Sequence, residues 1–403
     1  MRSALHRLWI GPALVVASAC GSNGGSSGGN PAPPANATSS CQLVESGFGE
    51  AGTAAIRVEV VASGLEVPWG IAFLPDGDML VTERPGRVRI VSKQGQLGAP
   101  IATPAVSKSG EAGLLGIALH PRFAENRQFY VYLTGERDGH DENRVERYVM
   151  SEDRSKATLD KVIVGGIPSA QYHDGGRLRF GPDGMLYIGT GDARSPERSQ
   201  DPKDLAGKIL RLTPDGEVPA DNPRAGSAAF ITGIRNTQGF DWLDDKTLVV
   251  SDHGPSGEYQ GRTGHDEVSI AHAGDNLGWP TIYGCGESTG MVTPAISWKT
   301  ANPPGGAAVY RGSAIQAWKG AVLVGGLRSE HLHMLRFGAG ERPGVERHEV
   351  YLAGKAGYGR LRDVVMGPDG HLYVTTSNCD GRGDCGDEKD RILRIVAAET
   401  APK

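Results

Sequence analysis

One histidine of the chain lies in a setting suited to proton transfer. His173 is followed by Asp174 and by two glycines, directly before a run of strand-forming residues. An imidazole can take up a proton near neutral pH, and glycines let a ligand approach the backbone closely. His173 is therefore a candidate general base. A hydrogen-bonded loop histidine is the simpler interpretation for any one of the 11 histidines.

Arginines precede several of the predicted strands. Arg235 and Asn236 lie in GIRNTQGF, and Arg360 and Arg362 lie in YGRLRDV, where their spacing places both on one face of a strand. A guanidinium group binds a planar carboxylate through two parallel hydrogen bonds, and an amide can donate to a carbonyl or oxyanion. Together with Arg328, these residues predict a positively charged funnel for a polycarboxylate ligand. Structural or surface arginines are the alternative.

The segment 251–280 is rich in oxygen ligands. Calcium takes about six to eight hard oxygen ligands from carboxylates and carbonyl groups. The spacing does not match an EF-hand loop, and a solvated acidic loop is the alternative to a calcium site. The carboxylate and amide side chains concerned are those of Asp252, Glu258, Asp266, Glu267, Asp275 and Asn276.

The elements that must position these residues are marked by a repeated turn. Pro-Asp-Gly occurs at residues 75–77, 182–184 and 368–370, each time between two apolar, strand-like runs. Proline fixes φ at the first turn position, the aspartate bonds back to the backbone, and glycine takes the position with positive φ. Each copy predicts a β-hairpin, so one structural unit is used several times along the chain.

Six strand-rich blocks lie between about residues 53 and 396, with just under 60 residues each. The 59 glycines and 25 prolines among 403 residues suit many short strands and turns. We therefore expect an all-β, six-bladed β-propeller over residues 53–398, with an irregular array of β-sandwiches as the alternative. In a propeller, the functional residues should lie in the loops just before each central strand. The blocks begin near Val67, Leu114, Gly175, Thr237, Ala308 and Arg362.

The N-terminal residues have the features of an export signal. A basic start and an apolar run end at residue 19, so residues 1–19 are interpreted as a signal peptide. The sequence Ala17-Ser18-Ala19-Cys20 resembles a bacterial lipobox. We expect residues 20–52 to be a lipidated cysteine and a flexible Gly/Ser/Pro linker, and the protein to be a periplasmic or cell-surface lipoprotein. Ordinary cleavage without lipidation is the alternative.

Four further cysteines suggest disulfides, as is usual in exported proteins. Cys379 and Cys385 are close in one loop and are expected to pair, which leaves Cys41 for Cys285 by elimination. Zinc binding is the alternative, but no CxxC spacing is present. The formal net charge of -5 gives no reason to expect a nucleic-acid partner.

The order of the motifs resembles that of the soluble glucose and aldose sugar dehydrogenases that use pyrroloquinoline quinone (PQQ). The motifs run from GLEVPWGIAFLPDG through EAGLLGIALHP, HDGGRLRFGPDG, GIRNTQGF and GDNLGWP to GRLRDVVMGPDG, and cover about residues 65–395. Each motif alone is weak, but six in this order are specific. The resemblance implies a six-bladed propeller, in agreement with the repeat count.

The resemblance also implies roles for individual residues. His173 matches the general base that takes the proton of the sugar's anomeric hydroxyl group. The positions that match contacts to PQQ are Glu111, Arg235, Asn236, Arg328, Arg360 and Arg362.

Calcium binding is implied at a separate group of positions. The carbonyl groups of Gly254 and Pro255 match ligands of the calcium ion that PQQ also binds. Asp266 and Glu267, with the carbonyl group of Leu277, could serve a second, structural calcium. The inserted residues 258–265 separate the two groups in this chain. A further departure is Tyr172, where glucose-specific members have aspartate.

These features predict a PQQ- and calcium-dependent enzyme that oxidises aldoses at the anomeric carbon to lactones and passes electrons to an external acceptor. A calcium-dependent propeller lactonase is one alternative, but it would need a cage of carboxylates and asparagines around a central metal. A non-catalytic surface propeller that binds glycans or proteins is the other.

Overall fold

Short strands joined by loops make up the computed structural model, which describes residues 40–353 and 357–398. Within these ranges the strands form six sheets, and each sheet contains at least four strands. The helices described are short: α1 (Phe123–Asn126) and the 3-10 turns η1 (Pro196–Gln200) and η2 (Gln316–Trp318). The low helix content agrees with the absence of any long helical period in the sequence.

Each sheet is one blade of the propeller, and the blades follow one another along the chain. Blade 1 contains β4 (Pro68–Phe73), β5 (Met79–Glu83), β6 (Arg87–Val91) and β7 (Leu97–Ala102). Blade 2 contains β8 (Leu114–Leu119), β9 (Gln128–Arg137), β10 (His140–Met150) and β11 (Ala157–Ile167). Blade 3 contains β12 (Leu178–Phe180), β13 (Leu186–Gly189), β14 (Ile209–Leu212) and β15 (Ala229–Ile231).

The remaining blades each include a strand from the N-terminal segment. Blade 4 contains β16 (Thr237–Trp242), β17 (Leu248–Asp252), β18 (Asp266–Ala271) and β19 (Ile296–Trp298), with β1 (Gln42–Val44) at its edge. Blade 5 contains β20 (Pro304–Val309), β21 (Val322–Gly326), β22 (Leu332–Phe337) and β23 (Val345–Tyr351), with β2 (Glu50–Ala51) at its edge. Blade 6 contains β24 (Leu361–Met366), β25 (Leu372–Thr376), β26 (Asp390–Ala397) and β3 (Ile56–Leu65).

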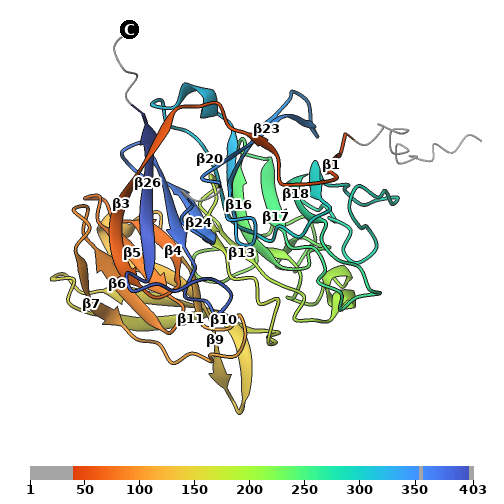
Figure 1. Ribbon diagram of the computed structural model, residues 1–403. Helices are drawn as coiled ribbons and strands as arrows, with labels where there is room; N and C mark the ends of the chain where they lie inside the picture. Colours follow the sequence, from red (N-terminus) through yellow and green to blue (C-terminus); the bar gives the residue numbers. More distant parts are fainter. Residues whose placement is uncertain (1–39, 354–356, 399–403) are drawn as a thin grey trace, which may run out of the picture. The chain divides into compact units, whose positions relative to one another are not determined.

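Blade 6 closes the ring because its outer strand comes from the start of the propeller. Strand β3, drawn in orange, runs antiparallel beside the dark blue β26 (Figure 1). One sheet thereby holds together the two ends of the propeller sequence, and β3 covers the edge of β26 that would otherwise be unpaired. The all-β, six-bladed propeller predicted from the repeats is confirmed.

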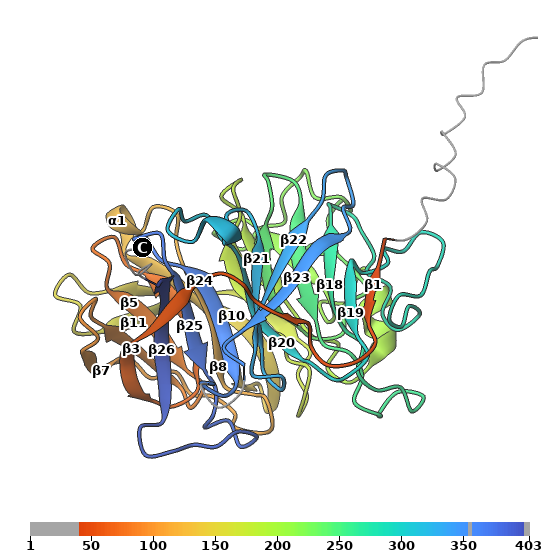
Figure 2. The ribbon, with the colours of Figure 1, turned by 45° about the horizontal axis from the view of Figure 1, so that its top comes forward.

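The predicted linker extends too far along the chain. Residues 42–44 and 50–51 were expected within the flexible segment 20–52, but they form β1 and β2, which pair in parallel with β19 and β23 (Figure 2). Such short strands carry no readable alternation, and only their distant partners define them. A disulfide between Cys41 and Cys285 fixes this segment.

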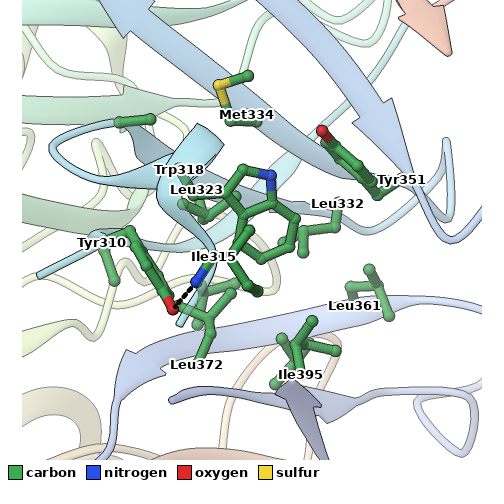
Figure 3. Close-up of a cluster of buried hydrophobic side chains, with 14 of the residues drawn as sticks. Tyr310, Ile315, Trp318, Leu323, Leu332, Met334, Tyr351, Leu361, Leu372 and Ile395 are labelled. Carbon is green, nitrogen blue, oxygen red and sulfur yellow. Dashed lines mark hydrogen bonds between the residues drawn. The ribbon is translucent and has the colours of Figure 1, made fainter. Parts of the chain in front are cut away.

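The blades are joined by buried apolar clusters. Between blades 5 and 6, the indole ring of Trp318 is fully buried and meets the ring of Tyr351 edge-on, with 5.0 Å between the ring centroids (Figure 3). Leu361 and Ile395 of blade 6 belong to the same cluster. Burying such aromatic surface contributes several kcal/mol to stability. This packing makes the propeller a rigid support for its loops.

The first strand of each blade lies nearest the propeller axis, where backbones approach closely. A Cβ atom at Gly239 of β16 would lie 2.5 Å from the carbonyl oxygen of Gly305 in β20. Glycine is therefore required at this contact. Since adjacent strands of a blade are antiparallel, the loop entering the first strand and the loop leaving the second lie at the same end. The predicted site residues fall in these loops.

Candidate active site

The loops at one end of the blades enclose a cavity of about 580 Å³. Its lining comes from blades 2 to 6 and contains most of the residues predicted to bind ligands. The sequence-predicted residues that line it are Glu111, His173, Arg235, Gly254, Pro255, Asp266, Arg328 and Arg360. Arg362 lines a small adjoining cavity, together with Glu111. The structure therefore brings together residues that lie far apart in the sequence.

His173 is held by a carboxylate that the sequence reasoning missed. Its side chain is buried, and its Nδ1 atom lies 2.7 Å from Oδ1 of Asp192. Because a carboxylate accepts hydrogen bonds, Nδ1 carries the proton and Nε2 is left free to accept one. The indole Nε1 of Trp279 donates to the other oxygen of Asp192 at 2.8 Å. His173 is thus oriented by a chain of two residues, as a general base requires.

A sequence signal for Asp192 did exist. In several blades an acidic residue stands at or just after the end of the second strand, and its carboxylate binds a nearby loop. In blade 1, Glu83 accepts from the N–H of Glu66. In blade 4, Asp252 accepts from the N–H groups of Arg235 and Asn236. Asp192 stands in the corresponding place after β13. Trp279 carries no comparable signal because it contacts Asp192 across 87 residues.

The backbone around this histidine is strained. His173, Ala193 and Arg194 have φ values of 72°, 50° and 63°, in the left-handed region that non-glycine residues rarely adopt. The N–H of Ala193 donates to the carbonyl of His173 at 3.2 Å, and the N–H of Arg194 donates to Asp192 Oδ1 at 2.8 Å. Strain of this kind costs about 1–3 kcal/mol per residue and concentrates at functional sites.

Glu111 connects three loops at the cavity wall. Its Oε2 accepts from the N–H of His173 at 3.2 Å and from Nδ2 of Asn236 at 3.3 Å, and its Oε1 pairs with Arg382 at 3.1 Å. Burial alone would raise the pKa of Glu111, but His253, Arg382 and His173 lower it to about 2. Glu111 is therefore an anion at any physiological pH, and Asn236 is fixed beside it.

The predicted arginine pair converges on one carboxylate. Arg360 and Arg362 are both buried, and both pair with Oδ2 of Asp380, at 2.9 and 3.3 Å. Arg362 also donates to Oε1 of Gln238 at 2.9 Å. Burial lowers the pKa of Arg362 to about 10, and the charge of Asp380 opposes this shift. Arg362 thus stays charged, and both guanidinium groups have further donors with which to bind an anion.

The other two predicted arginines differ in their surroundings. Arg235 is buried and pairs with Glu258, so that its charge is partly compensated. Its guanidinium group also lies 5.7 Å from the ring centroid of Trp279. Arg328 is exposed at the cavity rim, and among the described residues no carboxylate pairs with it. Arg328 is therefore available to a ligand without displacing an ion pair.

Both predicted disulfides are present. Cys41 pairs with Cys285, and Cys379 pairs with Cys385. The loop closed by the second bridge carries Asp380 and Arg382, which contact the arginine pair and Glu111. The sequence reasoning recognised this loop but neither of these two contacts.

The predicted calcium ligands are only partly gathered. Gly254, Pro255 and the carboxylate of Asp266 line the large cavity. Both oxygens of Asp266 already accept backbone N–H groups, from Gly254 at 2.9 Å and Asn302 at 2.6 Å, while burial raises its pKa to about 6. Glu258 also lines the cavity but pairs with Arg235, and the carbonyl of Pro255 accepts the N–H of Gly264. These groups are fewer than the ligands calcium needs. Any ion bound here must take further ligands from another molecule.

The proposed second calcium site finds no support in the geometry. Glu267 lines a separate small cavity with Asp252, and burial raises the pKa of Glu267 well above its ordinary value. Leu277 packs in the core between blades 3 and 4. Within the described ranges, no group of three or more His, Cys, Asp or Glu side chains is arranged to hold a metal ion. The inserted residues 258–265 separate the two groups of predicted ligands in the sequence but not in space, because the N–H of Gly254 donates to Oδ1 of Asp266.

The fold and the cavity define a six-bladed propeller with an arginine-lined ligand site beside a histidine–carboxylate pair. Residues 65–393 match the model of the glucose/sorbosone dehydrogenase family. The chain belongs to this family, that of the soluble PQQ-type aldose sugar dehydrogenases.

Several relatives cover most of the chain. Aldose sugar dehydrogenase YliI of Escherichia coli is 33% identical, over 82% of this chain and 92% of its own. The PQQ-bound aldose sugar dehydrogenase of Streptomyces coelicolor is 38% identical over 86% of this chain and 99% of its own, with a TM-score of 0.75. A solved structure from Thermus thermophilus is 44% identical over 85% of this chain and 100% of its own, with a TM-score of 0.77.

The predicted signal peptide and Cys20 lie outside the described residues, so lipidation stays a prediction. In residues 40–353 and 357–398, no helix has the length and apolar character to span a membrane. The two disulfides are consistent with export.

Proposed function

We propose that this protein is a PQQ- and calcium-dependent dehydrogenase that oxidises aldoses at the anomeric carbon to lactones. The observation that carries the proposal is the position of His173. It lies in the same cavity wall as the cationic groups, with one nitrogen held by Asp192 and the other free to accept a proton.

The chemistry of the donor set fits a quinone with several carboxylates. Arg328, Arg360 and Arg362 offer guanidinium groups on one side, and Arg235 offers donors on another, while the buried amide of Asn236 is engaged by Glu111 and Gly175. A volume of about 580 Å³ lies within the range of cofactor-sized sites, about 300–1,000 Å³. The carbonyl groups of Gly254 and Pro255 are hard oxygen atoms of the kind that calcium prefers, and they would hold the ion.

The residues of the chain would act on the sugar as follows. Nε2 of His173 takes the proton of the anomeric hydroxyl group, and Asp192 stabilises the imidazolium ion that results. Glu111 and Asn236 fix the loop that carries His173. When bound, PQQ supplies the hydride acceptor and calcium supplies Lewis acidity. Electrons then leave to an external acceptor, because the sequence contains no CxxCH haem motif.

We also propose that the protein is exported and reaches its sugar substrate outside the cytoplasm, held by a lipid at Cys20. The two disulfides support export. Labelling of the expressed protein with a fatty-acid analogue, compared with Cys20→Ser, tests the anchor. Equal labelling of both forms would disprove it.

Reconstitution tests the proposed activity. The purified apo-protein is titrated with PQQ and Ca²⁺ by absorbance, and aldose-dependent dye reduction is then followed. We expect saturable PQQ binding and turnover of several aldoses. No PQQ binding and no turnover of any sugar would contradict the proposal.

His173→Gln tests the role of the base. We expect PQQ binding to be retained and kcat to fall by about 10²- to 10⁴-fold, the range attributed to a positioned general base. Normal turnover in this variant would contradict the assignment.

The lactonase alternative is less well supported. It requires a cage of carboxylates and asparagines around a central metal, whereas among the charged residues that line the cavity arginines outnumber carboxylates. Lactone hydrolysis by the apo-protein with Ca²⁺ but without PQQ would favour it.

A further inference from the structure

Two guanidinium groups lie against the ring of Tyr172, the residue that precedes His173. The Cζ atom of Arg194 is 6.0 Å from the centroid of the Tyr172 ring, and that of Arg382 is 5.4 Å from it. All three side chains line the large cavity together with His173. Two positive charges therefore lie beside the candidate base, on the blade 3 side of the cavity.

Arg194 is anchored at its backbone but free at its side chain. Its N–H donates to Asp192 Oδ1 at 2.8 Å, and its φ of 63° places it in a strained, left-handed turn. These contacts fix the origin of the side chain relative to His173. A guanidinium group on an aromatic face keeps its N–H donors directed outward, where a carboxylate can accept two of them.

The charge of Arg194 is uncompensated, in contrast to most arginines of the cavity. Arg360 pairs with Asp380, Arg235 with Glu258, and Arg382 with Glu111. For Arg194, no carboxylate partner is found in the described part of the chain, and the residue is exposed to the cavity. An unpaired cation at a fixed place in a ligand cavity favours an anionic ligand.

This ligand is a substrate rather than the cofactor. The cationic groups matched to PQQ lie on blades 4, 5 and 6, whereas Arg194 follows the second strand of blade 3, two residues after the carboxylate that orients His173. Arg382 also comes from blade 6, but its side chain contacts Tyr172 and Glu111, beside Arg194. A group bound at Arg194 is therefore part of the molecule whose proton His173 removes.

We propose that Tyr172, Arg194 and Arg382 form a subsite for the carboxylate of an acidic aldose, so that uronic acids are preferred over neutral aldoses. Tyr172 provides the face on which both guanidinium groups rest. Arg194 supplies the free charge, and Arg382, still partly exposed, supplies additional donors. This inference rests on the proposed sugar oxidation and specifies its substrate class.

Matched sugars test the preference. The holoenzyme is assayed with D-glucuronate against D-glucose and with D-galacturonate against D-galactose, pairs that differ only at C6. We expect kcat/KM to be about three- to tenfold higher for each uronate, the range between exposed ion pairs and charge-assisted hydrogen bonds. Added salt should reduce this ratio. Equal or lower values for the uronates would overturn the inference.

Variants locate the preference. Arg194→Gln should reduce the uronate-to-aldose ratio to about one, and Arg194→Lys should keep part of it. Arg122→Gln is the matched control, because Arg122 is an exposed arginine beside α1 that lines none of the cavities described above. A ratio that Arg194→Gln leaves unchanged would overturn the assignment, as would an equal fall in Arg122→Gln.

Binding to the apo-protein separates the two proposals. Calorimetry without PQQ should detect tighter binding of glucuronate than of glucose, and Arg194→Gln should abolish the difference. If the PQQ-loaded protein oxidises no aldose, the proposed function is wrong. The difference in binding between glucuronate and glucose still shows whether the carboxylate subsite exists. Equal binding of both sugars would refute the subsite even in an active enzyme.

Discussion

The two ends of the blades are built in different ways. At one end, the Pro-Asp-Gly turns join the first and second strands of blades 1, 3 and 6, and each satisfies its own hydrogen bonds. Asp183 accepts from the N–H of Met185 and the hydroxyl group of Tyr187, both at 3.0 Å, and the turn at Asp369 repeats both contacts. These contacts span at most four positions and set the conformation of the turn. Each turn aspartate adds an ion pair to an arginine farther along the chain: Asp76 with Arg154, Asp183 with Arg211 and Asp369 with Arg394.

The loops at the other end are held by partners far along the chain. Glu111 contacts His173, Asn236 and Arg382, which lie 62, 125 and 271 residues away. No single loop of the cavity has a fixed conformation without the others. The difference teaches that the turns define the scaffold locally, whereas the site exists only when all the blades have assembled.

Asp192→Asn should have the largest effect. Oδ1 of Asp192 accepts from Nδ1 of His173 and from the N–H of Arg194, and Oδ2 accepts from the indole N–H of Trp279. The NH₂ group of asparagine must face at least one of these donors, so the hydrogen bonds that orient His173 are disturbed. The negative charge that stabilises the imidazolium ion is lost in either orientation. We expect kcat to fall by about 10²- to 10⁴-fold with PQQ affinity retained. Full activity would mean that His173 does not depend on its distant partner.

Two glycines of blade 3 allow a direct test of the comparison, because they flank the same strand, β12. Gly175 precedes the strand at the cavity end, with φ of 68°, and an added Cβ would lie 2.6 Å from the backbone of Thr190 and Gly191. Its N–H also binds Oδ1 of Asn236. For Gly175→Ala we expect destabilisation of about 4 kcal/mol or more, measured by denaturant unfolding, together with loss of turnover. A stable, active variant would show that the loops tolerate independent movement.

This difference between the two ends explains what the sequence could predict. Turn chemistry and strand alternation are local, so the repeats predicted six blades and the loops that carry function. The candidate residues at these loop positions, such as His173 and Arg360, were found in the cavity. Asp192, Asp380 and Arg382 were missed because their significance lies in contacts between loops that are not adjacent in the sequence. The strands β1 and β2 were missed for the same reason.

Acid should weaken a buried histidine pair on adjacent strands of blade 5 before it affects the turns. His333 and His348 are buried with 3.1 Å between their ring nitrogens; burial lowers the pKa of His333 well below its ordinary value and that of His348 to about 4. The unfolded chain takes up protons below about pH 6.5, while the folded chain does not. The contribution of these histidines to the free energy of unfolding is therefore complete above pH 6.5 and is lost as the pH drops towards 4. For His348 this loss is on the order of 3 kcal/mol.

His348→Gln tests this window, since glutamine can replace the hydrogen bond but does not titrate. We expect the unfolding free energy of the variant to change less between pH 6.5 and 4 than that of the parent. The turn carboxylates act at lower pH: although burial of Asp369 raises its pKa, the N–H of His371 and other partners lower it below 3.8. An unchanged pH profile in the variant would remove the histidine pair as the cause.

Gly184→Ala should have the smallest effect. Gly184 occupies the last position of the Pro-Asp-Gly turn with φ of 74°, and an added Cβ would meet nothing within 4 Å. Only the intrinsic cost of the left-handed conformation applies, about 1 kcal/mol, and turnover should match that of the parent. Gly175 and Gly184 have nearly the same φ. The difference in unfolding free energy between the two alanine variants therefore measures how much of the destabilisation at Gly175 comes from contacts between loops. Equal losses in both would mean that the site loops are as self-contained as the turns.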